Sequence, residues 1–417
     1  MTTRALLALG VVLATALPLS GQATTAYTGA TLWDGTGAAP VPNATIVVQD
    51  GRIVAAGAVQ APAGATVVDL SGRWIIPGLV NTHGHVDGRW APEGVTDADA
   101  RVVEDLLLYA RYGITTVNSL GGGGDASIRV RDVQEHAGLD RARLYVAGPV
   151  IGANTPEAGR AAVDRNAAMG VDWIKFRVDD NLGTSSKMSP AVGAAIIARA
   201  HELDLRVATH LFYLDDAKWL LRAGTDMIAH SVRDLAVDDE LIGLIRERGI
   251  CYVPTLTREL STFVYSERPE FFDDPFFLQH SSSAEIERVS APAFMRRQAE
   301  STSAARYRVA VGVAQRNLVR LVEGGVAVAM GTDSGPAARF PGYFEHLELE
   351  MMVEGGLTPE QALRSATGVA GDCLGEDVGT VEVGHWADFL VLAANPLADI
   401  TNTRSLEQVY IAGNRVR

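Results

Sequence analysis

Four of the nine histidines stand at the ends of short apolar runs, where a buried strand would meet its following loop. His83 and His85 end the first of these runs, and His210 and His230 end two later ones. Asp333 ends the last run, within Gly-Thr-Asp-Ser-Gly. His83 and His85 point to the same side of a strand, because side chains alternate with a period of two. Imidazole and carboxylate groups that converge in this way bind divalent metal ions, whereas one such histidine alone would more simply be a core residue.

Lys175 lies inside the apolar run 173–178. An unpaired ammonium group on a buried strand costs free energy, so this lysine must be paired, neutral or chemically modified. A neutral amine can take up carbon dioxide to give a carbamate, which is able to bridge two cations. The alternative is a structural ion pair with a neighbour such as Asp172.

These side chains need elements that bring them together, and the middle of the chain has a repeating pattern. Short apolar runs alternate with helical stretches, and several runs are preceded by a glycine that permits a left-handed C-cap. The runs are 74–80, 114–118, 144–147, 173–178, 206–210, 226–230, 251–255 and 326–333. The helical stretches are 97–112, 156–169, 190–203, 215–222, 238–248, 307–323 and 358–366. This series predicts an α/β fold, a (β/α)8 TIM-like barrel with its active site at the C-terminal ends of the strands.

Strand-like sequence patterns also occur before and after the predicted barrel, at both chain ends. Residues 26–69 have the pattern of short strands and turns, with Asp50-Gly51 as a hairpin turn. Residues 387–392 and 408–411 are strand-like again. We therefore expect a small β-sandwich domain assembled from both chain ends. The expected boundaries are 1–23 for a signal peptide, 24–77 for the first part of the sandwich, 78–372 for the barrel and 373–417 for the second part.

The composition of the chain narrows its class. Its 417 residues are 47% hydrophobic and 21% charged, which allows a large buried core. With 36 basic and 50 acidic side chains the net charge is −14, which argues against nucleic acid or an anionic membrane as a partner. We expect a small-molecule partner and leave the formation of a homo-oligomer open. Cys251 and Cys373 could pair in an exported protein, but each lies in an apolar context, and we expect two separate buried thiols.

The residues 1–23 have the pattern of a secretory signal peptide. Arg4 gives a positive start, 6–19 is an apolar run too short to span a bilayer comfortably, and Gly-Gln-Ala at 21–23 resembles a cleavage site. We expect the mature protein to be periplasmic or secreted, with no membrane contact after cleavage.

One connection is much longer than an ordinary barrel loop. Residues 256–303 include Arg258, Glu259 and several phenylalanines. A loop in this place lies over the mouth of a barrel. We therefore expect either a lid over the active site or a structural insertion or oligomer contact.

Five stretches of the chain carry a family resemblance. They are 77–85 (PGLVNTHGH), 170–175 (GVDWIK), 223–230 (AGTDMIAH), 331–333 (GTD) and 377–388 (DVGTVEVGHWAD). Together they make the sequence resemble the amidohydrolase superfamily, in its imidazolonepropionase-like and prolidase-like branch. The resemblance covers nearly the whole mature chain and implies a barrel with a small β-sandwich built from both chain ends.

The resemblance also implies a metal centre with two divalent ions. By position, His83, His85 and Asp333 would hold the more buried ion. His210 and His230 would hold the more exposed one. Imidazole and carboxylate ligands favour Zn2+, and Mn2+, Co2+ or Fe2+ are also compatible with them.

Two further roles are implied by the resemblance. Lys175, carboxylated on its side-chain nitrogen (N6-carboxylation), would bridge both ions together with a hydroxide. Asp333 would be the catalytic residue that orients this hydroxide, accepts its proton and delivers it to the leaving nitrogen. Two nearby cations would lower the pKa of the bridging water and polarise the substrate carbonyl group.

The implied activity is metal-dependent hydrolysis of an amide-type C–N bond, with a dipeptide or an N-acyl amino acid as the favoured substrate. A lactone, carbamate or urea hydrolase on the same site is the alternative. A deaminase fits less well, because deaminases of this superfamily commonly use one metal and lack the lysine that Lys175 matches. A binding protein without activity is disfavoured by the complete set of ligands.

The sequence departs from the family pattern at two places. Asn81 stands where relatives commonly have Asp before the first histidine pair. His210 is followed by bulky residues at 211–214, where many relatives are small and polar, so the choice of substrate is not transferable.

Four side chains are expected near the substrate, namely Tyr213, Arg233, Tyr252 and Arg258. Arginine suits the bidentate recognition of a carboxylate. For each arginine the alternative is a structural ion pair, for instance Arg233 with Asp234.

Overall fold

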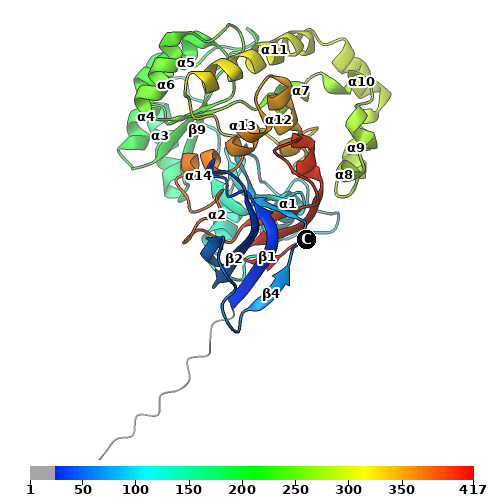
Figure 1. Cartoon of the computed structure of the whole chain (residues 1–417). Helices are drawn as coiled ribbons and strands as arrows, with labels where there is room; N and C mark the ends of the chain where they lie inside the picture. Colours follow the sequence, from blue (N-terminus) through cyan, green and yellow to red (C-terminus); the bar gives the residue numbers. More distant parts are fainter. Residues whose placement is uncertain (1–23) are drawn as a thin grey trace, which may run out of the picture.

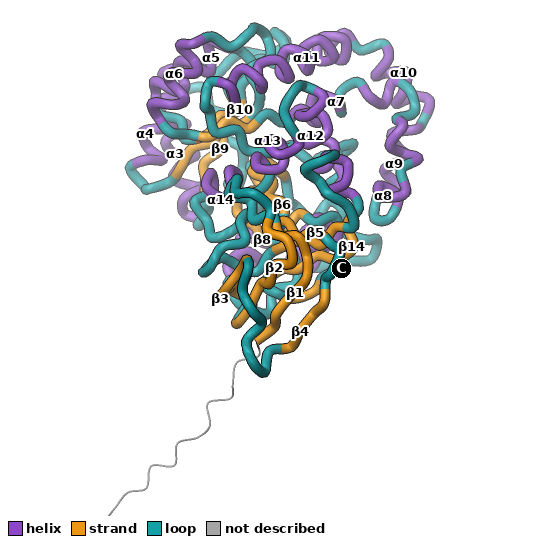
Figure 2. The backbone as a smooth tube through the Cα atoms, viewed as in Figure 1, coloured by secondary structure: helices purple, strands orange, loops and turns teal. Residues whose placement is uncertain are grey.

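The computed structural model describes residues 24–417, and the expected signal peptide at 1–23 lies outside the described residues. The chain forms a β-rich part, at the bottom of Figures 1 and 2, and a larger part in which strands and helices alternate. The secondary structure is therefore of the α/β class that the sequence predicts.

One mixed sheet contains strands from both chain ends (Figure 2). The strands are β1 Thr24–Leu32, β2 Val41–Gln49, β3 Arg52–Gly57, β4 Thr66–Asp69, β5 Trp74–Pro77, β13 Phe389–Leu392, β14 Leu406–Ile411 and β15 Asn414–Arg415. Their order is β15-β14-β13-β5-β1-β2-β3, and β4 pairs with β1. The two chain ends meet where β5 pairs antiparallel with β13, with Pro77 opposite Phe389. Both ends thus build one β unit, whereas its division into two facing layers stays a prediction.

Parallel strands carry or precede the predicted site residues. They are β6 Leu79–Gly84, β7 Ile114–Ser119, β8 Arg143–Val146, β9 Trp173–Arg177, β10 Arg206–His210, β11 Met227–Ala229 and β12 Cys251–Val253. Strands β6 to β8 form one sheet and β9 to β12 form another. Isolated bridges connect these sheets with each other and with the segment 326–334: Ile151–Phe176, Tyr252–Val328 and Gly84–Ser334. These contacts follow the order of strands in a barrel, and complete closure stays a prediction.

Helices separate the strands close to the predicted places. They are α1 Ala98–Arg111, α2 Asp125–Asp132, α3 Pro156–Ala168, α4 Pro190–His201, α5 Leu214–Ala223, α6 Asp239–Arg248, α11 Thr302–Glu323, α12 Tyr343–Glu354, α13 Pro359–Ser365 and α14 Gly368–Leu374. The sequence did not predict α2, α12 or α14. The reason is clearest for α12, which is buried on most of its faces and so lacks a one-sided apolar pattern. Within residues 24–417, no helix is both long and apolar enough to cross a membrane.

Two strand predictions need correction. The run 74–80 is two strands, because β5 joins the terminal sheet and β6 starts the parallel one, with Gly78 between them. A Cβ atom on Gly78 would lie 2.1 Å from Thr115 Oγ1, so a side chain does not fit at this crossing. The run 326–333 is not a continuous strand: Val328 forms a single bridge, and Asp333 has a φ of 57°, a left-handed conformation that interrupts strand pairing.

Glycines close the helices and turns where the sequence places them. The glycines before the apolar runs have φ between 61° and 111°: Gly113, Gly170, Gly224, Gly249 and Gly325. This left-handed conformation ends a helix and turns the chain back toward the next strand. At the tip of the β2–β3 hairpin, Asp50 and Gly51 both have positive φ, as a two-residue turn requires.

The long connection 256–303 is folded. It contains α7 Leu256–Leu260, η1 Val264–Ser266, η2 Glu270–Asp273, α8 Pro275–Leu278, α9 Ser283–Ser290 and α10 Pro292–Ala299. In Figure 1, α8 to α10 lie along one flank of the α/β part. Phe277 is fully buried, and its ring lies 5.0 Å from those of both Phe340 and Tyr343. This packing favours a structural insertion for most of the segment.

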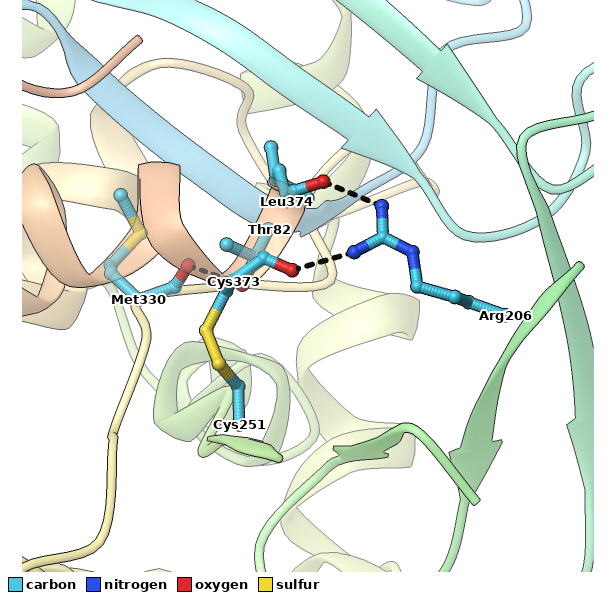
Figure 3. The surroundings of a disulfide bond; sticks show 6 residues. All are labelled: Thr82, Arg206, Cys251, Met330, Cys373 and Leu374. Atoms are coloured by element: carbon cyan, nitrogen blue, oxygen red, sulfur yellow. Dashed lines mark hydrogen bonds between the residues drawn. A yellow bond between two sulfur atoms is a disulfide. The ribbon is translucent and has the colours of Figure 1, made fainter. Parts of the chain in front are cut away.

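The two cysteines form a disulfide bond, so the expectation of separate thiols is wrong (Figure 3). Cys251 begins β12 and Cys373 lies in α14, with their Cα atoms 5.9 Å apart. Arg206 of β10 donates hydrogen bonds to the carbonyl groups of Cys373 and Leu374 at 3.1 and 2.5 Å (Figure 3). The apolar surroundings of each cysteine are real, but they gave no information on a partner 122 residues away.

Candidate metal centre

The structure places six predicted residues at the C-terminal ends of the parallel strands. His83 lies in β6, Lys175 in β9 and His210 at the end of β10. His85 follows the end of β6 and His230 that of β11, whereas Asp333 lies in the segment 326–334, which joins the strands only through isolated bridges. The predicted alternation of strands and helices is what brings these distant positions to one end of the fold.

His83, His85 and Asp333 form the tightest group, with one ligand atom of each within 4.8 Å of the others. Asp333 Oδ1 lies 2.5 Å from His85 Nε2 and 3.6 Å from His83 Nε2. His85 Nδ1 lies 2.9 Å from the carbonyl oxygen of Gly121, to which it donates its proton. In neutral His85 the Nε2 atom is therefore an electron-pair donor that faces a carboxylate oxygen. Such an approach requires a shared cation, either a proton or a metal ion.

Lys175 lies beside this group, with Nζ 3.2 Å from His83 Nε2. The residue is 2% exposed, and burial lowers its pKa to about 7, against an opposing effect of Asp333. A large fraction of the amine is therefore neutral near pH 7, which is the form that reacts with carbon dioxide. The alternative partner Asp172 instead forms an ion pair with Arg131.

His210 and His230 form a second group next to the first. Their ring centroids are 4.1 Å apart, and that of His230 is 4.6 Å from His83. Burial lowers the pKa of His210 to about 3 and that of His230 well below its ordinary value, so both imidazoles are neutral, as metal ligation requires. His230 Nδ1 lies 2.7 Å from Thr255 Oγ1, a contact that orients the ring.

Asp179 belongs to the same site and was missed by the sequence reasoning. It follows β9, is buried, and forms a hydrogen bond with His210 Nε2. Burial opposes its ionisation, but the hydrogen bond with His210 holds the pKa of Asp179 below its usual value. The only indication in the sequence was its position just beyond a strand end, since no motif marks it.

Two arginines flank Asp333, of which only Arg258 was predicted. Arg339 Nη1 donates to Asp333 Oδ2 at 2.5 Å, and Arg258 Nε lies 4.0 Å from the same oxygen. Burial would raise the pKa of Asp333, but Arg339 and His85 hold it well below its usual range. Arg258 Nη1 contacts Glu259 at 3.0 Å, whereas its buried Nε has no hydrogen-bond partner in the described part of the chain. The cationic side chain of Arg258 thus has its Nε donor next to the group formed by His83, His85 and Asp333.

The other three candidates for substrate contact have structural partners. Arg233 is buried, and its Nε lies 2.9 Å from Glu259. Tyr252 accepts a hydrogen bond from a backbone N–H at 2.6 Å, and Tyr213 donates to Asp180 at 2.8 Å. Their roles toward a substrate stay predictions.

A cavity of about 440 Å³ opens beside Tyr213 and Arg233. Residues of α11 also line it, among them Val309, Ala310 and Val313. None of the six proposed metal-site residues lines this cavity. A larger cavity, of about 680 Å³, lies between the segment 264–275 and α12 and contains none of the predicted site residues.

Several proteins are similar to this chain in sequence. An uncharacterised protein of Mycobacterium tuberculosis is 31% identical over 218 residues, which are 50% of this chain and 56% of that relative, so the chain spans about half the length of this relative. The imidazolonepropionase of Deinococcus deserti is 26% identical over 409 residues, which cover 90% of this chain and 92% of the relative.

Solved structures give the same result for the fold. A putative prolidase from Bifidobacterium longum superposes with a TM-score of 0.76 at 26% identity, covering 94% of each chain. A Xaa-Pro dipeptidase with bound methionine gives 0.74 at 22% identity, a likeness that shows the fold alone. The profile of the Amidohydrolase family matches residues 74–416, a range that includes the whole ligand cluster. The chain therefore belongs to the amidohydrolase family, in its imidazolonepropionase-like and prolidase-like branch.

Proposed function

We propose that this protein is a metal-dependent hydrolase that cleaves an amide-type C–N bond, with a dipeptide or an N-acyl amino acid as substrate. The observation that carries the proposal is the convergence of His83, His85 and Asp333, with ligand atoms within 4.8 Å of one another, beside Lys175. Family membership supports it, as do relatives named imidazolonepropionase and putative prolidase.

Two divalent ions fit the donor set. His83, His85 and Asp333 would hold one ion, and His210 and His230 would hold the other. Two observations support this fit. His85 Nε2 and Asp333 Oδ1, both electron-pair donors, face each other, and the buried imidazole of His210 is neutral. Zn2+ is favoured by this ligand chemistry, and Mn2+, Co2+ or Fe2+ are compatible with it. When bound, such ions lower the pKa of water and polarise a carbonyl group.

Asp333 is the residue that moves the proton in this proposal. Its Oδ1 faces the ligand cluster, while its Oδ2 is held by Arg339 at 2.5 Å. The carboxylate takes the proton of the attacking water and delivers it to the leaving nitrogen. Arg339 keeps the carboxylate ionised and fixes its direction.

Lys175 is carboxylated on Nζ in this proposal. The neutral amine attacks carbon dioxide: an N–C bond forms, one C–O electron pair moves onto oxygen, and a proton leaves the nitrogen for solvent. Burial supports this step, because it lowers the pKa of Lys175 to about 7. The resulting anion would lie between the two histidine groups and offset their divalent ions.

Metal analysis and a substrate panel test the proposal. Protein supplemented with Zn2+ should hold about two ions per chain, and their removal by a chelator should abolish the hydrolysis of dipeptides or N-acyl amino acids. Lys175→Arg should lose both activity and the second ion, because guanidinium cannot form the carbamate. His136→Ala, at an exposed histidine, is the matched control and should change neither.

The other outcomes of the panel are informative too. Preferred turnover of a lactone, carbamate or urea would favour the alternative hydrolase on the same site. One bound ion with full activity would favour a deaminase. A Lys175→Arg protein with two ions and wild-type turnover would mean that Lys175 is a structural residue, and absence of metal uptake by the wild type would refute the proposal.

We also propose that the protein is exported to the periplasm or the medium. The signal-peptide pattern at 1–23 supports export, and so does the disulfide bond between Cys251 and Cys373, because disulfides persist in oxidising compartments. N-terminal sequencing of protein from its native host should find a start near residue 24. An intact Met1 in abundant cytoplasmic protein would contradict export.

A further inference from the structure

Glu345 is a fully buried carboxyl group in the first turn of α12. Burial raises its pKa, and hydrogen bonds from Ser334 and Thr332 oppose that shift. Neither partner is itself a proposed metal ligand. A buried carboxyl group costs free energy unless it is hydrogen-bonded, so its partners indicate what it is for.

One oxygen of Glu345, Oε1, accepts three side-chain hydrogen bonds. Asn81 Nδ2 donates at 2.6 Å, Thr332 Oγ1 at 2.9 Å and Ser334 Oγ at 2.6 Å. The hydroxyl group of Tyr109 lies 2.8 Å from Ser334 Oγ and extends the network to α1. In a buried network of this kind, each hydrogen bond restrains the others.

The three donors stand next to the proposed metal ligands in the chain. Thr332 and Ser334 flank Asp333 on its two sides. Asn81 precedes His83 by two residues, and its Oδ1 accepts a hydrogen bond from the His83 N–H at 2.9 Å. The His83 carbonyl group accepts in turn from the Asp333 N–H at 2.7 Å. One buried carboxyl group therefore ties together the two segments that carry these ligands.

The backbone of Asp333 gives a reason for such an anchor. Its φ of 57° lies in the left-handed region, which residues other than glycine rarely adopt. A strained conformation persists only where the surroundings hold it. The side chains on both sides of Asp333 are bound to Glu345, and the Ser334 N–H also donates to Thr332 Oγ1 at 3.1 Å.

We propose that Glu345 is a positioning residue of the metal centre, which sets the placement of His83 and Asp333 through its three hydrogen-bond partners. The buried carboxyl group near His83 and His85 is that of Glu345 in α12. The side-chain amide of Asn81 faces it. The inference rests on the metal site proposed above.

Exchanging the amide of Asn81 and the carboxyl group of Glu345 tests whether these two side chains act as a pair. Asn81→Asp would bring a second carboxyl group to about 2.6 Å from Glu345 Oε1 and should weaken Zn2+ binding by about 10- to 100-fold, the usual effect of disturbing residues that orient metal ligands. Glu345→Gln on the same chain restores one carboxyl group opposite one amide. The double variant should therefore return to within about threefold of the wild-type affinity.

Removal of the carboxyl group gives a second test. Glu345→Ala removes the acceptor that three buried donors share and should also weaken Zn2+ binding by about 10- to 100-fold. Asp388→Asn is the matched control: Asp388 is equally buried, but it binds Arg143 at 3.0 Å next to the terminal sheet. The control should lower the unfolding temperature and leave Zn2+ affinity unchanged. The visible spectrum of Co2+-loaded protein reports ligand geometry independently of activity.

The outcomes separate the positioning role from the metal site itself. Wild-type Zn2+ affinity and an unchanged Co2+ spectrum in Glu345→Ala would overturn the proposal. If that variant does not fold, the exchange decides, because it creates no cavity: a loss in Asn81→Asp that Glu345→Gln does not relieve would overturn the pairing. A wild-type protein that takes up no divalent metal would instead refute the proposed function.

Discussion

We propose that Arg258 recognises a substrate carboxylate. Its guanidinium group lies over the ring of Tyr307, 4.7 Å from the centroid, and its Nε approaches Asp333 to 4.0 Å. Glu259 contacts it but also pairs with Arg233, so loss of Arg258 would leave no unpaired buried carboxylate. This residue can therefore be replaced while Glu259 keeps a second cationic partner, Arg233.

Arg258→Met should raise KM for substrates with a free carboxylate by about 10- to 100-fold, because a hydrogen bond to a charged group contributes about 1.5–3 kcal/mol. The matching carboxamide substrates should be almost unaffected. Arg258→Lys should recover only part of the loss, since an ammonium group lacks the bidentate fork. Steady-state kinetics with each acid and its amide would check this, and an equal rise of KM for both would contradict it.

At the level of elements, α12 carries a second buried carboxyl group one turn after Glu345. Glu348 accepts hydrogen bonds from the backbone N–H groups of Leu256 and Thr257 at 2.6 and 2.7 Å, and so anchors the start of α7. Burial raises the pKa of Glu348 to about 8, against these hydrogen bonds. Because α7 contains Arg258, this contact links α12 to the mouth of the site.

The contribution of Glu348 to the free energy of unfolding should therefore decrease as pH rises from about 4.5 to about 8. In that window native Glu348 keeps a proton that the unfolded chain has released, so the native state binds more protons and its stability drops with pH, by at most about 1.4 kcal/mol per unit. Glu348→Gln lacks this term. Urea unfolding of metal-free protein at several pH values should show that the stability of Glu348→Gln increases relative to that of the wild type as pH rises. If the two free energies of unfolding changed with pH in the same way, the prediction would be wrong.

The strand ends could be predicted because their signals are local. His83 and His85 share a strand period, and Gly113 or Gly224 marks the end of a helix by its own backbone freedom. Arg339 and Glu345 carry no such mark, because their roles arise only when a turn or a helix folds back onto Asp333. The same holds for the disulfide partner of Cys251, which depends on where α14 docks.

At the scale of the whole molecule, the disulfide bond joins β12 to α14, just before the chain re-enters the terminal sheet. It closes a loop with a sequence separation of 122 residues. A cross-link over so long a loop restricts the unfolded chain much more than the folded one.

Replacement of both cysteines by serine should lower the unfolding free energy by about 2–4 kcal/mol. Reduction of the wild type with a phosphine reductant, which unlike a dithiol is a weak Zn2+ ligand, should have a similar effect, whereas the metal content of the folded protein should not change. Chemical denaturation of oxidised and reduced protein measures the difference. Equal unfolding midpoints would show that the bond does not contribute to stability.

The pairing of β5 with β13 has a consequence for how the chain folds during its synthesis. As a chain leaves the ribosome, β1 to β5 emerge first, yet the edge of β5 is covered only after the whole α/β part has been made. Contacts between such distant segments form slowly, and uncovered strand edges invite aggregation. The edge of β5 that pairs with β13 thus stays unpaired through most of the synthesis of the chain. A chain released early would keep that edge open, so the terminal sheet makes complete translation a condition for the native fold.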